Sequence, residues 1–394
     1  LLIAVSLARS APPLAGALVE GFGIGLTGAI FVGVGAVAAQ LTESARSARG
    51  IAMAVLGVAY VVRALADGVA DSSPLHALQW VSPLEWAALA RPYAGERWWV
   101  LALPLLLTGV LIAVAFRLES RRDHGAGLRA TRPGPANASP ALSSASGLAW
   151  RLHRGSVVSW TVGVLVFSVA IGSLSGSVDQ IVVDNPQVAE MFRRMGGGAQ
   201  QLRDAFFVAM LGIMVGVLGV LALQIFGRLA REEDQGHAEV LLATATARTR
   251  LAASHLLPAL LVPTVLLGAT GVCLALPQAV SDGSLAVLGQ IGGAALVLAP
   301  GLWLIVGLAM ALYGWAPRLG IIPWVVVGWS LFMLWLGGIL DLPERLVQAT
   351  PFAALPQLPV EPLDWTPIVV MTGIAVVLVA VGLVGFRRRD IATT

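Results

Sequence analysis

The chain has 394 residues, of which 57% are hydrophobic and only 12% charged, and its formal net charge is +3. Soluble domains carry about 25% charged residues, so this composition excludes an ordinary soluble protein and predicts an all-α protein that crosses a membrane many times. All 25 basic residues are arginine. Such a balance indicates loops on one side of a membrane rather than nucleic-acid binding. Because the chain begins at Leu1 without a methionine, we expect it to be a fragment.

Apolar runs of about 20 residues predict nine membrane spans after a short stub at residues 1–8. The spans are placed at residues 14–40, 51–69, 98–118, 156–177, 204–228, 255–277, 285–314, 321–340 and 366–386. The run at 51–69 carries Arg63 and Asp67 near its outer end. These two lie four residues apart on one helical face and can neutralise each other.

Arginine is concentrated in alternate loops of this plan. The arginine-rich set comprises residues 41–50, 119–155, 229–254, 315–320 and 387–394. Loops rich in basic residues stay in the cytoplasm, so these loops and the C-terminus are predicted to be cytoplasmic.

A Gly, Pro, Ala and Ser-rich stretch, residues 125–148, predicts a flexible cytoplasmic linker. Residues 148–160, with Trp150 and Arg154, suit an interfacial helix that leads into the next span. The linker separates two copies of one pattern. SPLEW (82–86), an apolar span and ESRRD match TPFAALP (350–356), an apolar span and FRRRD at nearly equal spacing.

This repetition predicts two homologous halves of six spans each, with residues 1–124 the end of the first and 149–394 the second. The intact protein would then have roughly 510 residues and twelve spans. Residues 70–97 and 341–365 precede the last span of each half. Both are rich in proline and aromatic residues and predict short helices that dip into the outer leaflet.

The most densely charged run between two apolar segments is residues 228–256. Its acidic side chains exclude it from lipid. Read as a helix, it places Val240, Leu241 and Thr244 on one face and Glu232 and Glu239 on another. This pattern predicts a short amphipathic helix for a membrane surface or a partner protein, and an ordinary solvated loop is the alternative.

Catalytic motifs are absent from the sequence. A nucleotide-binding GxxxxGK[ST] loop needs a lysine, and the chain has none. The five histidines are scattered without metal-ligand spacing. We therefore expect no enzyme activity, metal or cofactor in this chain.

The pattern as a whole resembles the permease subunit of ABC-2-type exporters, in particular the duplicated actinobacterial group that exports polyketide or tetronasin antibiotics. The segments that carry the resemblance are EEDQGHAEVLLATATARTRLAASHL (232–256), AAQLTESARSARGIAMAVLGVAYVVRALAD (38–67) and SPLEW, RPYAGERWW and RRDHGAG within 82–127. The resemblance implies a bacterial plasma-membrane protein that exports hydrophobic drugs. It also implies two copies of a separate ATPase subunit, which would bind the ATP and Mg²⁺.

In that family a cytoplasmic coupling helix docks on the ATPase, and residues 229–254 occupy its place. The resemblance implies that the contact includes Glu232, Glu233, Gly236, Glu239, Leu241, Leu242, Ala243, Thr244, Arg248 and Arg250. Family members often have proline near the position of Ala245, so the bend of this helix is not fixed by the resemblance.

Substrate contacts have no motif of their own. Apolar residues of the spans that are candidates for a drug cavity are Phe206, Met210, Met214, Trp303 and Met310. Such residues more often pack against other helices or lipid. A secondary transporter built from repeats and driven by an ion gradient remains the alternative.

Overall fold

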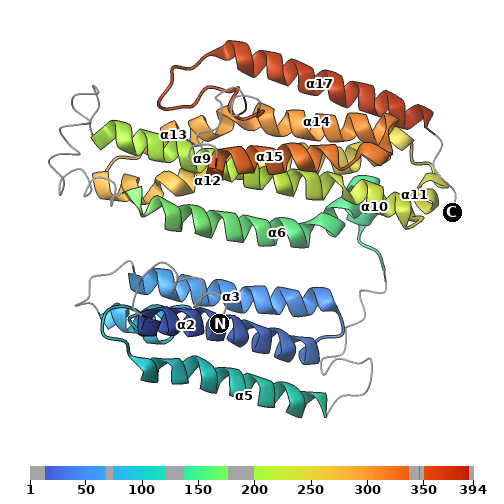
Figure 1. The fold of residues 1–394 in the computed structure, drawn as a ribbon. Coiled ribbons are helices and arrows are strands. Elements are labelled where there is room, and N and C mark those ends of the chain that lie inside the picture. The colour runs from blue at the N-terminus through green and yellow to red at the C-terminus, as the bar shows by residue number, and fades with distance from the viewer. Residues whose placement is uncertain are drawn as a thin grey trace. The chain divides into compact units, whose positions relative to one another are not determined.

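The structure is a computed structural model that describes residues 14–67, 74–120, 137–175, 199–336, 346 and 350–389. Every element in this described part is a helix, as the composition predicts. The chain divides into two compact units, Leu1–Ala136 and Asn137–Thr394, which are treated one at a time (Figure 1).

The first unit is built from three long helices. They are α2 (Leu14–Leu41), α3 (Ala45–Asp67) and α5 (Ala102–Glu119), and α2 packs against both of the others. Gly33 lies on the α2–α5 contact, where a Cβ atom would come within 2.9 Å of the Leu111 Cβ. Small residues at such points let apolar helices pack closely without a hydrophobic driving force between them.

Between α3 and α5 the chain forms three short helices, η1 (Pro74–Trp80), α4 (Trp86–Leu89) and η2 (Trp98–Leu101). The Trp80 and Trp99 rings stack at 5.7 Å, and Trp86 Nε1 donates to the Trp80 carbonyl at 2.9 Å. The short helices predicted within 70–97 are therefore present in its described part, and their depth in a bilayer remains a prediction. In the corresponding segment of the second unit, 341–365, residues 350–364 form turns and irregular chain. Of residues 341–349, only 346 is described.

The second unit is a larger helical bundle. Its long helices are α6 (Ala145–Gly172), α9 (Ala199–Phe226), α12 (Arg248–Asp282), α13 (Ala286–Val297), α14 (Ala299–Trp315), α15 (Ile322–Leu336) and α17 (Trp365–Arg388), with the short η3 (Pro140–Ser143) and η4 (Pro317–Leu319). Helix α9 contacts α12, α14 and α15, while α6 covers α12 and α17 covers α14 (Figure 1). Fully buried Phe207, Leu218 and Leu267 belong to one continuous apolar core.

Helices α14 and α17 meet backbone to backbone. A Cβ atom on Gly382 would lie 2.4 Å from the Met310 carbonyl, and one on Gly314 would lie 2.3 Å from the Gly382 carbonyl. Only glycine fits at these points, because any side chain would have to displace main-chain atoms of the neighbouring helix.

Eight helices of the described part are long and apolar enough to cross a membrane. They coincide with eight of the nine predicted spans, and α13 and α14 together form one of them, with a break at Leu298. The ninth prediction, 51–69, overlaps α3 but extends beyond the described residues, so it stays a prediction. Arg63 of α3 pairs with Glu85 at 2.6 Å, while the Asp67 side chain lies outside the described part.

Two helices begin before the apolar runs that predict their spans. The expected interfacial helix 148–160 is the continuous beginning of α6, which Ser144 caps by accepting a hydrogen bond from the Gly147 amide at 3.1 Å. Helix α12 begins at Arg248 rather than at 255, and it contains Pro258, Pro263 and Pro277. Charged residues can occupy helix ends that reach water, so hydropathy alone does not locate these ends.

Candidate functional site

The charged stretch between α9 and α12 forms two short helices rather than one. Helix α10 (Arg228–Asp234) and helix α11 (His237–Leu242) meet at Gly236, whose φ of 74° lies in the left-handed region that glycine adopts without strain. The chain then turns and enters α12 after Ala247, which is extended. The predicted single amphipathic helix over 229–254 is therefore wrong in form. We call residues 228–247 the α10–α11 arm.

Glu233 fastens the arm to two other helices. Its carboxylate forms an ion pair with the Arg389 guanidinium at the end of α17 and accepts a hydrogen bond from the Tyr313 hydroxyl of α14. The Glu233 and Arg389 side chains are only 12% and 19% exposed. A charge pair this well shielded from water, with added hydrogen bonds, fixes a geometry more firmly than an exposed pair does.

Two aromatic rings pack against the arginine of this pair. The guanidinium of Arg389 lies 4.8 Å from the centroid of the Tyr313 ring, which stacks on Phe386 at 5.3 Å. Phe226, the last residue of α9, packs edge-on against Tyr313 at 5.9 Å. Arg248 closes the cluster by donating to the Arg389 carbonyl at 2.6 Å. We call Glu233, Tyr313, Phe386 and Arg389 the latch.

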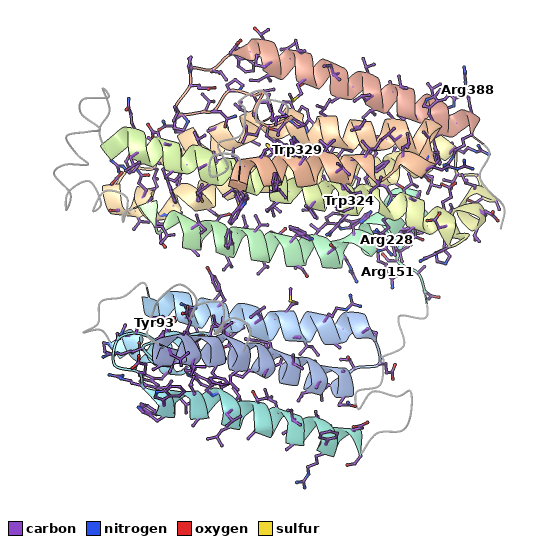
Figure 2. All side chains as sticks on the ribbon, in the orientation of Figure 1. Tyr93, Arg151, Arg228, Trp324, Trp329 and Arg388 are labelled. Carbon is purple, nitrogen blue, oxygen red and sulfur yellow. The ribbon has the colours of Figure 1, made fainter. Side chains whose placement is uncertain are left out.

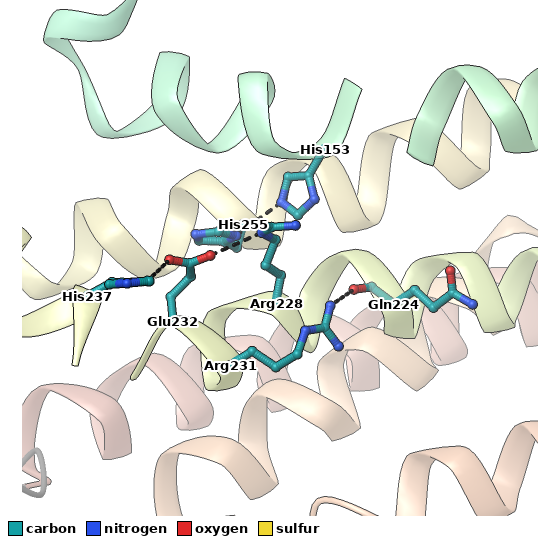
Figure 3. Close-up of polar contacts among 7 residues, drawn as sticks. All are labelled: His153, Gln224, Arg228, Arg231, Glu232, His237 and His255. Carbon is teal, nitrogen blue, oxygen red and sulfur yellow. Dashed lines mark hydrogen bonds and ion pairs between the residues drawn. The ribbon is translucent and has the colours of Figure 1, made fainter. Parts of the chain in front are cut away.

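A second network surrounds Glu232, as Figure 3 shows. Glu232 accepts from Arg228 Nε at 3.1 Å, one helical turn earlier, and pairs with His237 Nδ1 at 3.0 Å across the Gly236 break. Arg231 donates to the Gln224 carbonyl at 3.2 Å. These contacts hold α10 and α11 at a defined angle to each other and to the end of α9.

Beside this network two histidines join α6 to α12. His153 Nε2 and His255 Nδ1 lie 3.1 Å apart, and both residues are only 3% exposed (Figure 3). One ring donates its N–H to the other, which satisfies a polar group that would be costly to leave unpaired among apolar side chains. In the described part of the chain no group of three or more potential ligands is arranged to hold a metal ion.

Two polar side chains of the described spans, Gln224 and Glu20, are also hydrogen-bonded. Gln224 Oε1 accepts from Trp160 Nε1 at 3.1 Å, and Glu20 accepts from the Tyr93 hydroxyl at 3.0 Å. Tyr93 has a positive φ of 66°, and its ring lies where a Cβ on Gly16 would have to be.

The structure divides the predicted docking residues by the direction they face. Leu241 and Leu242 pack inward against the core, and Glu232 and Glu233 are used in the contacts described above. Glu239 is half-buried, and Arg248 binds the Arg389 carbonyl. The outer surface of the arm comprises Arg231, Asp234, Gln235, His237, Val240, Ala243, Thr244, Ala245 and Ala247, with Arg250 exposed just beyond it.

The predicted cavity residues lie in or against the core of the second unit. Met310 is fully buried and Met214 is 4% exposed, while Phe206 and Met210 are half-buried beside them. Trp303 is also half-buried and donates its Nε1 hydrogen to Thr264 Oγ1 at 2.9 Å. In this conformation their surroundings are those of packing residues, and their role toward a substrate remains a prediction.

Sequence reasoning did not identify the latch or the histidine pair. Arg389 is one of three consecutive arginines in the C-terminal segment 387–394, and Tyr313 lies in no motif. The two latch charges are 156 residues apart, and the two histidines are 102 apart. No local signal encodes contacts at such separations.

Comparison with known proteins places the chain among drug-efflux permeases. The family described as multidrug efflux system permease Rv1217c, C-terminal domain, matches residues 142–387. The multidrug efflux system permease protein Rv1217c of Mycobacterium tuberculosis (strain ATCC 25618 / H37Rv) is 39% identical over 379 residues. The alignment covers 96% of this chain and 68% of that protein.

Proposed function

Since the chain belongs to the family of multidrug efflux system permeases represented by Rv1217c, we propose that it is the membrane subunit of an ATP-driven exporter. Its substrates would be hydrophobic or amphiphilic compounds, including antibiotics. Two copies of a separate ATPase subunit would bind ATP and Mg²⁺ on the cytoplasmic side. Binding and hydrolysis there would drive the permease between inward- and outward-facing states.

The observation that carries this proposal is the α10–α11 arm. It presents an exposed surface while its inner residues are fixed to α9, α14 and α17. If a partner displaces a segment held in this way, the attached helices move with it. A free loop would change its own conformation and leave the helices where they are. The arm also lies at the arginine-rich end of the second unit, which the positive-inside rule assigns to the cytoplasm.

Within the arm, we assign the ATPase contact to the outward-facing residues. Val240 is 70% exposed at the centre of α11, with Ala243 and Thr244 exposed close to it. Leu241, Leu242 and Glu233 would act indirectly, by holding the arm against the bundle. An exposed valine between polar residues suits insertion into a shallow apolar pocket on a partner.

The two-half organisation is part of the same proposal. In each unit, taken by itself, the last long helix packs closely against another long helix at a glycine. In the first unit Gly33 of α2 faces Leu111 of α5, and in the second Gly307 of α14 faces Ala375 of α17. A second glycine of the same helix contacts the segment that precedes the last helix. Gly23 of α2 faces Ala87, and Gly301 of α14 faces Phe352. These parallels support homologous halves.

The proposal is tested by changing the exposed surface alone. Val240→Arg in the intact permease is expected to abolish co-purification of the ATPase subunit and drug-stimulated ATP hydrolysis, while thermal stability stays unchanged. Leu319→Arg is the matched control, because Leu319 is 46% exposed in η4 at the same end of the unit but outside the arm. If the intact wild-type permease co-purifies with no ATPase, the proposal is wrong.

A further inference from the structure

The first turns of α6 form a surface that neither the arm nor the latch uses. Trp150, Arg151 and Arg154 are exposed there, and Val158 and Val162 follow them as exposed apolar residues. At 100° per residue these five side chains fall on one face of the helix. Ala149, His153 and Val164 lie on the opposite face and are buried. Figure 2 labels Arg151 at this end of α6.

Neither Arg151 nor Arg154 forms an ion pair or a side-chain hydrogen bond with any residue that the structure describes. Helix α6 contains no acidic residue. In the arm, Glu232 binds Arg228 and His237, while Glu233 binds Arg389.

We propose that this face of α6 binds one anionic phospholipid of the cytoplasmic leaflet. Arg151 and Arg154 would hold the phosphate, because guanidinium groups match phosphate oxygens with paired hydrogen bonds. Trp150, which is 49% exposed, would lie at the headgroup level, where indole rings are preferred. Val158 and Val162, which are 61% and 59% exposed, would contact an acyl chain one and two turns deeper.

The order of these residues along the helix favours a lipid over a soluble phosphate. Charge comes first, then the small and exposed Gly155 and Ser156, then the apolar stripe. Arg154 and Val158 are one turn apart, about 6 Å along the axis. A free phosphate would use the arginines and leave the exposed valines without a role. The buried His153–His255 pair fixes the other face of α6 to α12 and so keeps this surface turned away from α12.

The first test measures lipid bound to the intact permease. Wild-type protein extracted from membranes is analysed by native mass spectrometry, and then again after exchange into nanodiscs of phosphatidylglycerol or phosphatidylcholine. We expect phosphatidylglycerol to be retained, and Arg151→Gln with Arg154→Gln to lower its retention about thirtyfold, since each basic residue near the surface contributes about fivefold. Unchanged retention in the double variant would overturn the proposal.

The matched control removes two charges elsewhere at the same end of the second unit. Arg318→Gln with Arg388→Gln changes exposed arginines that have no side-chain partner in the described part of the chain. We expect this control to retain phosphatidylglycerol as wild type does. An equal loss in both double variants would mean that only diffuse charge attraction is present, and the α6 site would be refuted.

A second measurement needs no variant and so does not depend on the folding of one. Wild-type permease should melt at a higher temperature in phosphatidylglycerol nanodiscs than in phosphatidylcholine nanodiscs, because a ligand that binds only the folded state stabilises it. Glycerol 3-phosphate at the same concentration should not displace the lipid. Equal melting temperatures, or displacement by glycerol 3-phosphate, would reject the lipid assignment. Neither result depends on whether an ATPase partner exists.

Discussion

At Gly382 the contact surface between two helices is the main chain itself. Alanine at this position would place its Cβ 2.4 Å from the Met310 carbonyl of α14, so the helices must separate. We expect Gly382→Ala to destabilise the permease by about 1–3 kcal/mol, the usual cost of overpacking. Gly373→Ala on the same helix is the control, because a Cβ there meets no atom within 4 Å. Thermal unfolding in detergent should separate the two variants, and equal melting temperatures would contradict the packing argument.

Asp364 caps the first turn of α17. Its carboxylate accepts a hydrogen bond from the Thr366 amide at 2.8 Å, and this bond lowers the pKa of Asp364 below its usual value. The stabilisation is therefore present above the unfolded-state pKa and is lost as the pH falls through the lower pKa of the folded state. Asp364→Ala should lower the melting temperature at neutral pH, whereas Asp364→Asn should keep the cap and lose only the acid dependence. Identical pH profiles for wild type and Asn would refute this.

The latch is the unit that couples the arm to the bundle. Arg389→Gln removes the charge that balances Glu233 and leaves that carboxylate shielded, at a cost of about 2 kcal/mol. We expect the proposed ATPase to remain bound but drug-stimulated hydrolysis to fall, because the exposed surface that we propose for docking is unchanged. Arg388→Gln is the neighbouring control, since Arg388 is exposed (Figure 2) and has no side-chain partner in the described residues. Equal stimulation in both variants would show that the latch transmits nothing.

Helices were predictable from the sequence to the extent that lipid dictates them. Runs such as 204–228 and 366–386 must be helical because an unpaired backbone is not tolerated in hydrocarbon, and both are found as helices. The arm is different, since water satisfies its backbone in any conformation. Its division at Gly236 depends on the contact between Glu232 and His237 and on the long-range pair of Glu233 with Arg389. Those contacts exist only after the bundle has formed.

For the whole molecule, the energy source separates an ATP-driven exporter from a secondary transporter. Inverted membrane vesicles that contain the permease and its ATPase should accumulate a hydrophobic dye when ATP is supplied. Accumulation should continue after the proton gradient is collapsed, and it should stop when ATP is replaced by an analogue that is not hydrolysed. Dye uptake that follows the gradient and ignores ATP would favour the secondary transporter.

Substrate choice was the part least accessible to sequence reasoning. Met214 and Met310 were selected as apolar span residues, and both are buried in the core of the second unit. Hydropathy does not distinguish a side chain that touches a drug from one that touches another helix, because spans are apolar on all sides. The charged stretch lies between α9 and α12, as its exclusion from lipid predicts, but which of its residues face outward was not encoded locally.

Helix α12 runs from the arm to the far end of the second unit, and its three prolines set how stiff that path is. A proline has no N–H, so the carbonyls of Ser254, Ala259 and Cys273 lack the usual donor four residues later. At the far end, Asp282 is tied to Arg203 of α9 at 3.6 Å. We therefore expect α12 to bend at its prolines when the latch moves, rather than to move as one rigid body. A displacement at Arg248 would bend it before it moved Asp282, which would delay opening at one end until the other had closed.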